Sequence, residues 1–514
     1  MFRNSIAALA AFATMSAAGA LSVAAAQTDI KIDRDAPIGT IQPEVYGQFL
    51  EHLGTQVYDG IWVGEDSDIP NTDGIRNDVY GALDRLDIPV IRWPGGCYAD
   101  MYHWRDGIGD ERTPRVNMSW GGTPEPNGFG THEFFNLAEK LGAKTYLNVN
   151  LGSGTITEAA DWLEYITATG DSALAQERRA NGRENPWKID YLSIGNETWG
   201  CGGNMRPAYY ADLYAQWATL LKVEGEMPVR IISGSHEGNI DYSDEILDHP
   251  AMGNLSDGIS VHYYTLPTGD WGEKGDALDF PEEEWISTLS RTIKMDGIIE
   301  EQLAMIDSHD LGEEKLGLYV DEWGMWVDGE EGAPALNQQN TIRDAVVAAL
   351  NFDIFHKYAD RVPMTNIAQM VNVLQAMILT DGPEMILTPT YHVYEMYVPF
   401  QGATALPVSF DSPDYSHGGE TIPALSVSAA IAENGDILIS VVNADASDAH
   451  DVTLPAFGAA SATVRQLTGD SMDAHNSFDD PDAVTPVQFD VPVTSGKLRM
   501  RLEPRSVSVL RIEQ

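Results

Sequence analysis

The sequence contains little cysteine and little positive charge. Its 514 residues include only two cysteines, Cys97 and Cys201, so no framework of several disulfides holds this fold together. Lysine and arginine number 31 against 78 acidic residues, which gives a formal charge of −47 at pH 7. This charge argues against nucleic acid and anionic lipid as partners, whereas a neutral polysaccharide can approach at little electrostatic cost. We interpret the acidity as adaptation to saline surroundings or as an aid to solubility.

Beyond its N-terminus the chain also lacks a long apolar run and a clustered metal-ligand pattern. No stretch reaches the roughly eighteen consecutive apolar residues of a transmembrane helix, so we predict no membrane association. The twelve histidines are scattered, with no His-x-x-x-His or Cys-x-x-Cys pattern. We therefore predict no metal and no cofactor.

The first 26 residues combine a basic start with an apolar stretch. Arg3 is their only charged residue, and three alanines at 24–26 precede Gln27. This composition is typical of a secretory signal peptide with a small-residue cleavage site, rather than of a membrane anchor. We therefore predict a signal peptide at 1–26 and an exported protein, either periplasmic or secreted.

Between about residue 46 and residue 370, strand-like runs alternate with helix-like stretches such as 206–224 and 340–358. The strand-like runs are 46–51, 90–94, 145–151, 191–197, 230–236, 258–264, 316–323 and 364–370. Eight strands, each followed by a helix, predict an α/β fold of the (β/α)8 TIM barrel type.

After about residue 400 the chain changes to alternating apolar and polar residues separated by Gly, Asp, Asn and Pro, which predicts an antiparallel β-sandwich. Three such segments are 437–442, 462–467 and 507–512. Residues 28–32 are also strand-like, and we expect them to pair into the same sandwich. We therefore divide the chain into a catalytic barrel of 44–395 and a β-sandwich domain of 27–43 plus 396–514.

Two of the predicted barrel strands end in a glutamate, Glu197 and Glu322. In a (β/α)8 barrel the catalytic groups lie at the carboxyl ends of the strands. A carboxylate there is costly to desolvate unless it is partnered, and a pair of carboxylates is what glycoside hydrolysis requires. A single polar residue at a strand end more often caps a helix or satisfies the backbone, but two glutamates at corresponding places point to a glycosidase.

The segments around these glutamates resemble a known family. They read RWPGG at 92–96, HWRDGIG at 103–109, GNETWG at 195–200 and DEW at 321–323. This ordered set is similar to the signatures of glycoside hydrolase family 51, the α-L-arabinofuranosidases of clan A. The likeness extends from 46–52 to 367–369 and on to a C-terminal sandwich.

By this resemblance Glu197 is the general acid/base and Glu322 the nucleophile of a retaining double displacement. Carboxyls about 5 to 5.5 Å apart leave no room for an intervening water, so one attacks the anomeric carbon while the other protonates the departing oxygen. Glu322 must then start ionised and Glu197 protonated. Tyr264 and Arg92 are the expected partners of the ionised Glu322.

The resemblance also implies the remaining site residues. Three polar side chains would hydrogen-bond furanose hydroxyls or the ring oxygen: Glu51, Asn196 and Gln369. Two residues would line the site, His262 and Tyr264. Two tryptophans would contact the sugar or the chain that bears it, Trp120 and Trp326.

Cys97 departs from a common form of the family, in which an asparagine touches the substrate, so an amide contact is missing from that subsite. Cys97 follows the second predicted strand and Cys201 follows the acid/base loop. In an exported barrel the two could meet across the mouth and form a disulfide, and two separately buried thiols are the alternative.

The resemblance implies an exo-acting enzyme that removes terminal α-L-arabinofuranosyl residues from arabinoxylan, arabinan or derived oligosaccharides. A β-xylosidase or an endo-β-1,4-glucanase on the same scaffold is the alternative, because family resemblance fixes mechanism better than sugar preference. A binding protein without turnover is disfavoured because both glutamates are present. A homo-oligomer, a hexamer or smaller, is also implied.

Overall fold

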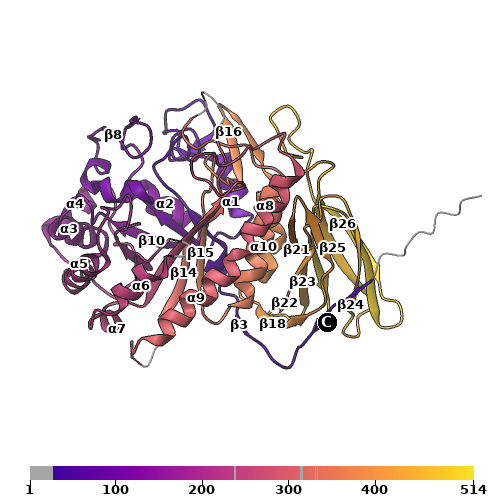
Figure 1. The fold of residues 1–514 in the computed structure, drawn as a ribbon. Coiled ribbons are helices and arrows are strands. Elements are labelled where there is room, and N and C mark those ends of the chain that lie inside the picture. The colour runs from indigo at the N-terminus through magenta and orange to yellow at the C-terminus, as the bar shows by residue number, and fades with distance from the viewer. Residues whose placement is uncertain (1–26, 237–238, 313–315, 330–331, 333) are drawn as a thin grey trace, which may run out of the picture.

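The computed structural model describes residues 27–236, 239–312, 316–329, 332 and 334–514. The predicted signal peptide at 1–26 lies outside these residues. Figure 1 shows two parts, a barrel ringed by helices and a β-sandwich formed by the C-terminal part of the chain. In the described ranges, no helix is both long and apolar enough to cross a membrane.

The barrel is closed by eight parallel strands that follow one another around it in chain order, which confirms the predicted (β/α)8 fold. The strands are β4 (Gly47–Phe49), β7 (Val90–Trp93), β10 (Lys144–Val149), β11 (Tyr191–Ile194), β12 (Val229–Ile232), β13 (Gly258–Thr265), β14 (Gly317–Met325) and β15 (Met364–Ile367). They are buried on both faces, as expected of parallel strands covered by helices, and this explains their nearly continuous apolar sequences.

The helices run between the strands and cover the barrel from outside. They are α1 (Asn77–Asp84), α2 (Thr131–Leu141), α3 (Ile156–Thr167), α4 (Ala173–Ala180), α5 (Pro207–Leu220), α6 (Ile240–Leu247), α7 (Met252–Leu255), α8 (Glu282–Thr292), α9 (Lys294–Ser308), α10 (Ile342–Lys357) and α11 (Pro389–Tyr397). Proline occupies the first turn of α5, where its missing N–H costs nothing. This helix ends before the predicted residue 224 because Leu221 already has an extended backbone.

Short elements decorate the connections. The 3-10 helices are η1 (Pro43–Tyr46), η2 (Cys97–Met101), η3 (Trp104–Gly107) and η4 (Val398–Phe400). Two-stranded ribbons are formed by β5 (Asn71–Thr72) with β6 (Ile75–Arg76), β8 (Arg115–Asn117) with β9 (Thr123–Glu125), β16 (Ile378–Asp381) with β17 (Glu384–Leu387), and β20 (Asp414–His417) with β21 (Glu420–Pro423). Of these, η2 follows β7 directly and reaches the mouth of the barrel.

The sandwich consists of two sheets packed around an apolar core. The larger sheet has the order β26 (Val487–Pro492), β25 (Ser461–Thr468), β28 (Ser506–Ile512), β23 (Ile437–Asn443), β22 (Leu425–Ile431), β18 (Thr404–Leu406) and β3 (Gly39–Thr40). The smaller sheet has the order β1 (Thr28–Asp29), β24 (His450–Pro455) and β27 (Lys497–Leu502). All described pairings within these sheets are antiparallel except that of β1 with β24.

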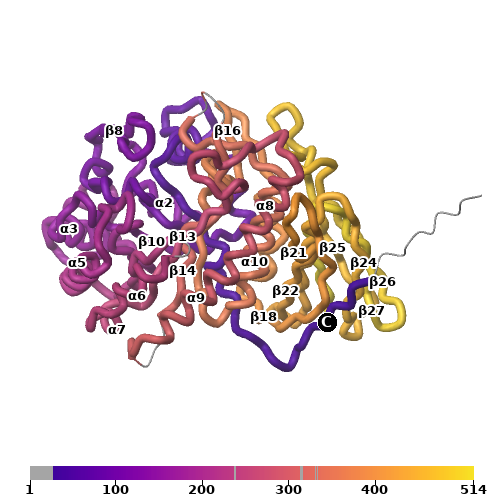
Figure 2. Tube along the Cα trace, viewed as in Figure 1, coloured from indigo at the N-terminus to yellow at the C-terminus, as the bar shows by residue number. Residues whose placement is uncertain are grey.

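The N-terminal segment belongs to the sandwich. Besides β1 and β3, the strand β2 (Lys31–Ile32) pairs with β19 (Val408–Ser409). Figure 2 traces this indigo segment from the edge of the sandwich into the barrel. The pairing supports the proposed division into 44–395 and 27–43 plus 396–514.

Helix α10 lies between the two parts of the molecule. It packs against β14 of the barrel and against β22, β23 and β28 of the sandwich, and Figure 1 shows it in this position. A helix covered on all sides is expected to be apolar around its whole circumference, and nearly every residue of α10 is buried. The contact also contains polar groups, because His356 hydrogen-bonds Tyr46 of the barrel side and Ser428 of the sandwich.

Candidate active site

The two predicted catalytic glutamates meet at the carboxyl end of the barrel. Glu197 follows β11 and Glu322 lies within β14. Both carboxylates contact the same ring nitrogen, Nδ1 of His262, at 2.9 Å from Glu197 Oε1 and 3.4 Å from Glu322 Oε2. One oxygen of each glutamate and a ring nitrogen of His262 all lie within 4.8 Å of one another. The carboxylates therefore share one site.

Both oxygens of Glu322 accept a hydrogen bond. Arg92 Nη1 donates to Oε2 at 2.8 Å, and the Tyr264 hydroxyl donates to Oε1 at 2.8 Å. Arg92 and Tyr264 therefore hold both oxygens of the predicted nucleophile in a fixed orientation.

The backbone of β14 brings two consecutive acids to the same guanidinium. Side chains alternate between the faces of a regular strand, yet both Asp321 and Glu322 approach Arg92, at 3.7 Å and 2.8 Å. The register of β14 against β15 shifts between Val320 and Trp323, and such an irregularity re-aims side chains. Burial disfavours the charge of the Arg92 guanidinium, but the charges of Asp321 and Glu322 raise the pKa of Arg92 above its ordinary value.

His262 links the acid/base candidate to a buried carboxylate. Its Nε2 lies 3.0 Å from Asp321 Oδ1, and its Nδ1 contacts Glu197. Burial works against the imidazolium, but the charges of Glu322 and Asp321 raise the pKa of His262 to about 10. At neutral pH this ring is therefore charged and donates from both nitrogens, which orients the Glu197 side chain.

Glu51 forms a second buried cluster beside Glu322. Its carboxylate accepts hydrogen bonds from the Tyr98 N–H, Trp120 Nε1 and Gln369 Nε2, at 3.1 to 3.2 Å. Burial, followed by the nearby charge of Glu322, raises the pKa of Glu51 to about 7. Through these hydrogen bonds, Glu51 holds Trp120 and Gln369 in place.

These groups surround a cavity of about 330 Å³. All but two of the predicted site residues line it, together with residues that the sequence analysis did not select: Leu53, Trp199, His236, Tyr263, Trp271, Leu336 and Leu374. The two exceptions, Arg92 and Asn196, are buried and in contact with each other, and Arg92 holds Glu322.

Aromatic side chains form one wall of the cavity. The Trp326 ring packs edge-on against Tyr264 and Trp271, with centroids 5.1 and 5.3 Å apart. Trp271 is 51% exposed, although it is a large aromatic residue. Its position in a Gly- and Asp-containing segment directly after a barrel strand is the sequence signal that could have identified it.

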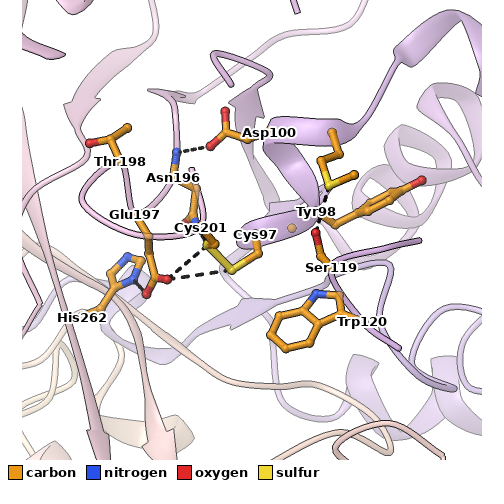
Figure 3. The surroundings of a disulfide bond; sticks show 12 residues. Cys97, Tyr98, Asp100, Ser119, Trp120, Asn196, Glu197, Thr198, Cys201 and His262 are labelled. Carbon is orange, nitrogen blue, oxygen red and sulfur yellow. Dashed lines mark hydrogen bonds and ion pairs between the residues drawn. A yellow bond between two sulfur atoms is a disulfide. The ribbon is translucent and has the colours of Figure 1, made fainter. Parts of the chain in front are cut away.

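Cys97 and Cys201 form a disulfide, with an S–S distance of 2.11 Å and Cα atoms 5.5 Å apart. Figure 3 shows this bond beside the Glu197 carboxylate. The two sulfurs lie 3.9 and 3.4 Å from Glu197 Oε2. Of the two alternatives left by the sequence, the structure contains the disulfide.

Among the residues that the structure describes, two groups of side chains have the donor types and spacing of a metal site. One is Cys97, Glu197 and Cys201, whose sulfurs are joined in the disulfide. The other is Glu197, His262 and Glu322, where both ring nitrogens already contact carboxylates. The second group is therefore held together by its own hydrogen bonds and ion pairs.

Comparison with known proteins identifies the family. Residues 82–270 match the model of the α-L-arabinofuranosidase 1 domain, and residues 321–506 match that of the α-L-arabinofuranosidase C-terminal domain. The chain is 45% identical to an intracellular exo-α-L-arabinofuranosidase of Bacteroides ovatus, over 94% of this chain and 95% of the relative.

The chain belongs to the α-L-arabinofuranosidases of glycoside hydrolase family 51.

Two solved structures agree with this family 51 assignment. The arabinofuranosidase of Xanthomonas axonopodis pv. citri has a TM-score of 0.91 at 44% identity, covering 95% of this chain and 99% of its own. The Thermotoga maritima enzyme, solved as an arabinose complex, has a TM-score of 0.83 at 30% identity, covering 95% and 100%. The barrel with its C-terminal sandwich is thus the architecture of the family.

The comparisons correct one prediction from the sequence. The 45% identical relative is named an intracellular enzyme, which contradicts the predicted export to the periplasm or the medium. That prediction depended only on the composition of residues 1–26, which lie outside the described residues. A basic start followed by an apolar stretch was therefore insufficient evidence of secretion for this family 51 chain.

Proposed function

We propose that this family 51 enzyme is a retaining, exo-acting α-L-arabinofuranosidase that releases terminal α-L-arabinofuranosyl residues from arabinoxylan, arabinan or derived oligosaccharides. The observation that carries the proposal is the approach of Glu197 and Glu322, of which one carboxylate oxygen each lies within 4.8 Å of the other. Inverting enzymes keep their carboxyls about 6.5 to 9.5 Å apart to admit a water, so the short separation supports double displacement.

In the first step, Glu322 attacks the anomeric carbon while Glu197 gives its proton to the departing glycosidic oxygen. Arg92 and Tyr264 each donate to one oxygen of Glu322, so the attacking carboxylate is held in one orientation. The products are a glycosyl ester on Glu322 and an alcohol, the shortened chain.

In the second step, a water takes the place of the departed alcohol. Glu197, now ionised, accepts a proton from this water, whose oxygen attacks the anomeric carbon and displaces Glu322. His262 donates to Glu197 and so holds the side chain of the base in one orientation during this step. Arabinose leaves with retained configuration, and both glutamates return to their starting protonation states.

The cavity supports action on one terminal sugar. Its volume of about 330 Å³ suits a small ligand, and the aromatic wall offers apolar faces for the C–H surfaces of a sugar. Gln369 lines this cavity, and its side-chain oxygen is buried and has no hydrogen-bond partner among the described residues. This oxygen is available to accept from a furanose hydroxyl, as proposed for Gln369 together with Glu51 and Asn196.

The proposed partner is a neutral arabinose-containing chain, consistent with the net charge of −47. We also keep the homo-oligomer, a hexamer or smaller, as a proposal. Light scattering on the purified enzyme measures the mass of the particle in solution, and a monomer would refute the proposed homo-oligomer.

Two variants and three substrates test the function. Glu322→Ala is expected to abolish turnover of every substrate. Glu197→Ala is expected to retain cleavage of aryl α-L-arabinofuranosides with acidic leaving groups, which need no proton, and to lose cleavage of those with poor leaving groups. Equal losses on both substrates would refute the role of Glu197. Preference of the parent enzyme for an aryl β-D-xyloside would favour the β-xylosidase alternative.

A further inference from the structure

The short helix η2 is attached at two points to the loop that carries Glu197. Helix η2 contains Cys97, which is bonded to Cys201 on the far side of Glu197, and Asp100, whose Oδ2 accepts the backbone N–H of Asn196 at 2.9 Å. Figure 3 shows both attachments close to Glu197, which lies between Asn196 and Cys201 along the chain. The loop is thus tethered to η2 on both sides of the proposed acid/base residue.

Asp100 joins the ends of three neighbouring barrel strands. It follows β7, and its Oδ1 accepts the backbone N–H groups of Leu151 and Gly152, which follow β10, both at 2.8 Å. Its Oδ2 accepts from Asn196, which follows β11. All three donors are backbone amides, so this carboxylate fixes main-chain positions.

The Asp100 carboxylate is placed at an energetic cost. Its side chain is buried, and the three bonds described for its oxygens come from neutral amides, not from a cation. Burial raises the pKa of Asp100 to about 7, although the backbone hydrogen bonds of Asn196, Gly152 and Leu151 work against that rise. A buried carboxylate without a cation is unfavourable for folding, so packing alone does not account for it.

The loop also needs restraint, because its backbone is unusual at the catalytic position. Glu197 has φ of 41°, in the left-handed region that residues other than glycine rarely adopt. The chain approaches itself closely here: a Cβ on Gly202 would overlap the Asn196 carbonyl and lie 2.7 Å from Asp100 Oδ2. Such a conformation persists only where the surroundings hold it.

We propose that Asp100 is a positioning residue for Glu197. By holding the Asn196 N–H, it keeps the acid/base carboxylate aimed at the glycosidic oxygen. This inference rests on the proposed role of Glu197 as acid/base. Asp100 touches neither the cavity nor, in this proposal, the sugar, and acts only through the loop.

The test compares kcat/KM on aryl α-L-arabinofuranosides with poor and with acidic leaving groups. Asp100→Asn keeps the shape of the side chain but replaces one acceptor oxygen by an NH2 group. This group cannot accept a hydrogen bond from a backbone N–H. We expect it to lower kcat/KM about 10- to 100-fold on the poor leaving group, the scale of a misaligned catalytic group. On the acidic leaving group, whose departure needs no proton, kcat/KM should stay within about twofold. Equal losses on both would indicate a merely structural role and overturn the proposal.

Asp353→Asn is the matched control. Asp353 is also a buried carboxylate whose pKa is raised by burial to about 7, but it accepts from Ser426 and Tyr397 between the barrel and the sandwich. Its variant is expected to lose stability while the ratio of the two kcat/KM values stays that of the parent. A changed ratio would mean that any buried carboxylate affects the acid step, and would overturn the assignment to Asp100.

A double variant separates this proposal from the function on which it rests. In the Glu197→Ala background, Asp100→Asn should leave kcat/KM on the acidic leaving group unchanged within about twofold and add no further loss on the poor one. A further loss would overturn the proposal. If Glu197→Ala alone shows no dependence on the leaving group, the function itself fails. Should Asp100→Asn not fold, Asp100→Glu displaces the carboxylate by one methylene and must show the same selective loss.

Discussion

Arg92 is the residue on which the charge balance of the site depends. It is fully buried and holds Glu322, the carbonyl of Asp321 and the side chain of Asn196, with its guanidinium 4.4 Å from the centre of the Phe49 ring. Asp321 is also buried, and its pKa is lowered, because the charges of Arg92 and His262 outweigh burial. Without Arg92, the carboxylates of Asp321 and Glu322 would remain buried with the His262 imidazolium as their cationic contact.

Arg92→Met is therefore expected to lower the free energy of unfolding by about 3 to 5 kcal/mol, the usual effect of removing one partner from a buried ion pair. Adding Glu322→Gln should restore part of that loss, since the uncompensated charge is removed. Urea unfolding of the parent, the two single variants and the double variant measures this. An Arg92→Met variant as stable as the parent would contradict the charge balance described above.

At this scale the sequence predicted the residues that stand in recognisable motifs, such as Arg92 and Glu322. It did not predict the part played by Asp321, because strand alternation points neighbouring side chains to opposite faces and the irregularity of β14 is invisible in the sequence. The contacts of Asp100 were not predicted, because its partners are backbone amides, which carry no sequence signal.

The loop after β11 is the element that determines where Glu197 points. It packs so closely that two of its glycines differ sharply in the room around them. A Cβ on Gly202 would overlap the Asn196 carbonyl, whereas a Cβ on Gly200 would lie 3.7 Å from its nearest neighbour, the Glu197 carbonyl. Neither glycine needs a left-handed backbone.

Gly202→Ala is expected to lower kcat/KM on poor leaving groups by about tenfold or more, because the loop must shift and misalign Glu197, the proposed acid. Gly200→Ala is the matched control, because it adds the same methyl group at an ordinary van der Waals distance from its neighbours. Its kcat/KM should remain within about twofold of the parent value. Steady-state kinetics on purified, folded variants measures both. Equal activities of the two variants would show that the position of the loop does not limit the rate.

The segment between β13 and α8 carries the exposed Trp271 to the cavity rim. Trp271→Ala is expected to raise KM for arabinose-bearing oligosaccharides several-fold, since stacking faces of this kind contribute about 0.5 to 1.5 kcal/mol. It should leave KM for a small aryl arabinofuranoside nearly unchanged. A similar change in both KM values would mean that Trp271 supports the pocket rather than the chain beyond it.

Strands and helices were predictable because their apolar periodicity is local. The shapes of the loops were not, since they depend on contacts between segments far apart in the chain, such as Asp100 with Asn196.

In the whole molecule, the barrel and the sandwich meet around a buried histidine. His356 lies 2.7 Å from the Tyr46 hydroxyl and 2.6 Å from Ser428 Oγ, and burial lowers its pKa to about 3. The unfolded imidazole binds a proton below about pH 6.5, so between pH 3 and 6.5 the unfolded chain binds more protons at this position. The stability contributed by neutral His356 is therefore lost as the pH falls through this range.

His356→Gln should remove this pH dependence. Its deficit in unfolding free energy relative to the parent is expected to shrink by about 2 kcal/mol between pH 7.5 and pH 5. The deficit of Asp353→Asn should instead grow as the pH falls. The raised pKa of Asp353 makes the folded parent bind the extra proton between about pH 4 and 7, which stabilises the parent at low pH. Urea unfolding at both pH values tests the pair. A pH-independent deficit for His356→Gln would contradict a buried neutral imidazole.

The sequence predicted the two parts of the molecule but not how they fit together. The segment 340–358 was predicted as a helix, yet its burial between barrel and sandwich depends on strands more than sixty residues further along the chain. Cellular location lies at this scale too, and there the prediction of export was wrong.

The most direct test of the central claim is to trap the glycosyl-enzyme. Glu197→Ala lacks the proposed base of the second step, so an arabinofuranoside with an acidic leaving group should load the variant faster than water unloads it. Mass spectrometry of the intact protein, followed by peptide mapping, is predicted to find one arabinofuranosyl group esterified to Glu322. An ester on any other residue, or arabinose released by the parent enzyme with inverted configuration, would contradict the account.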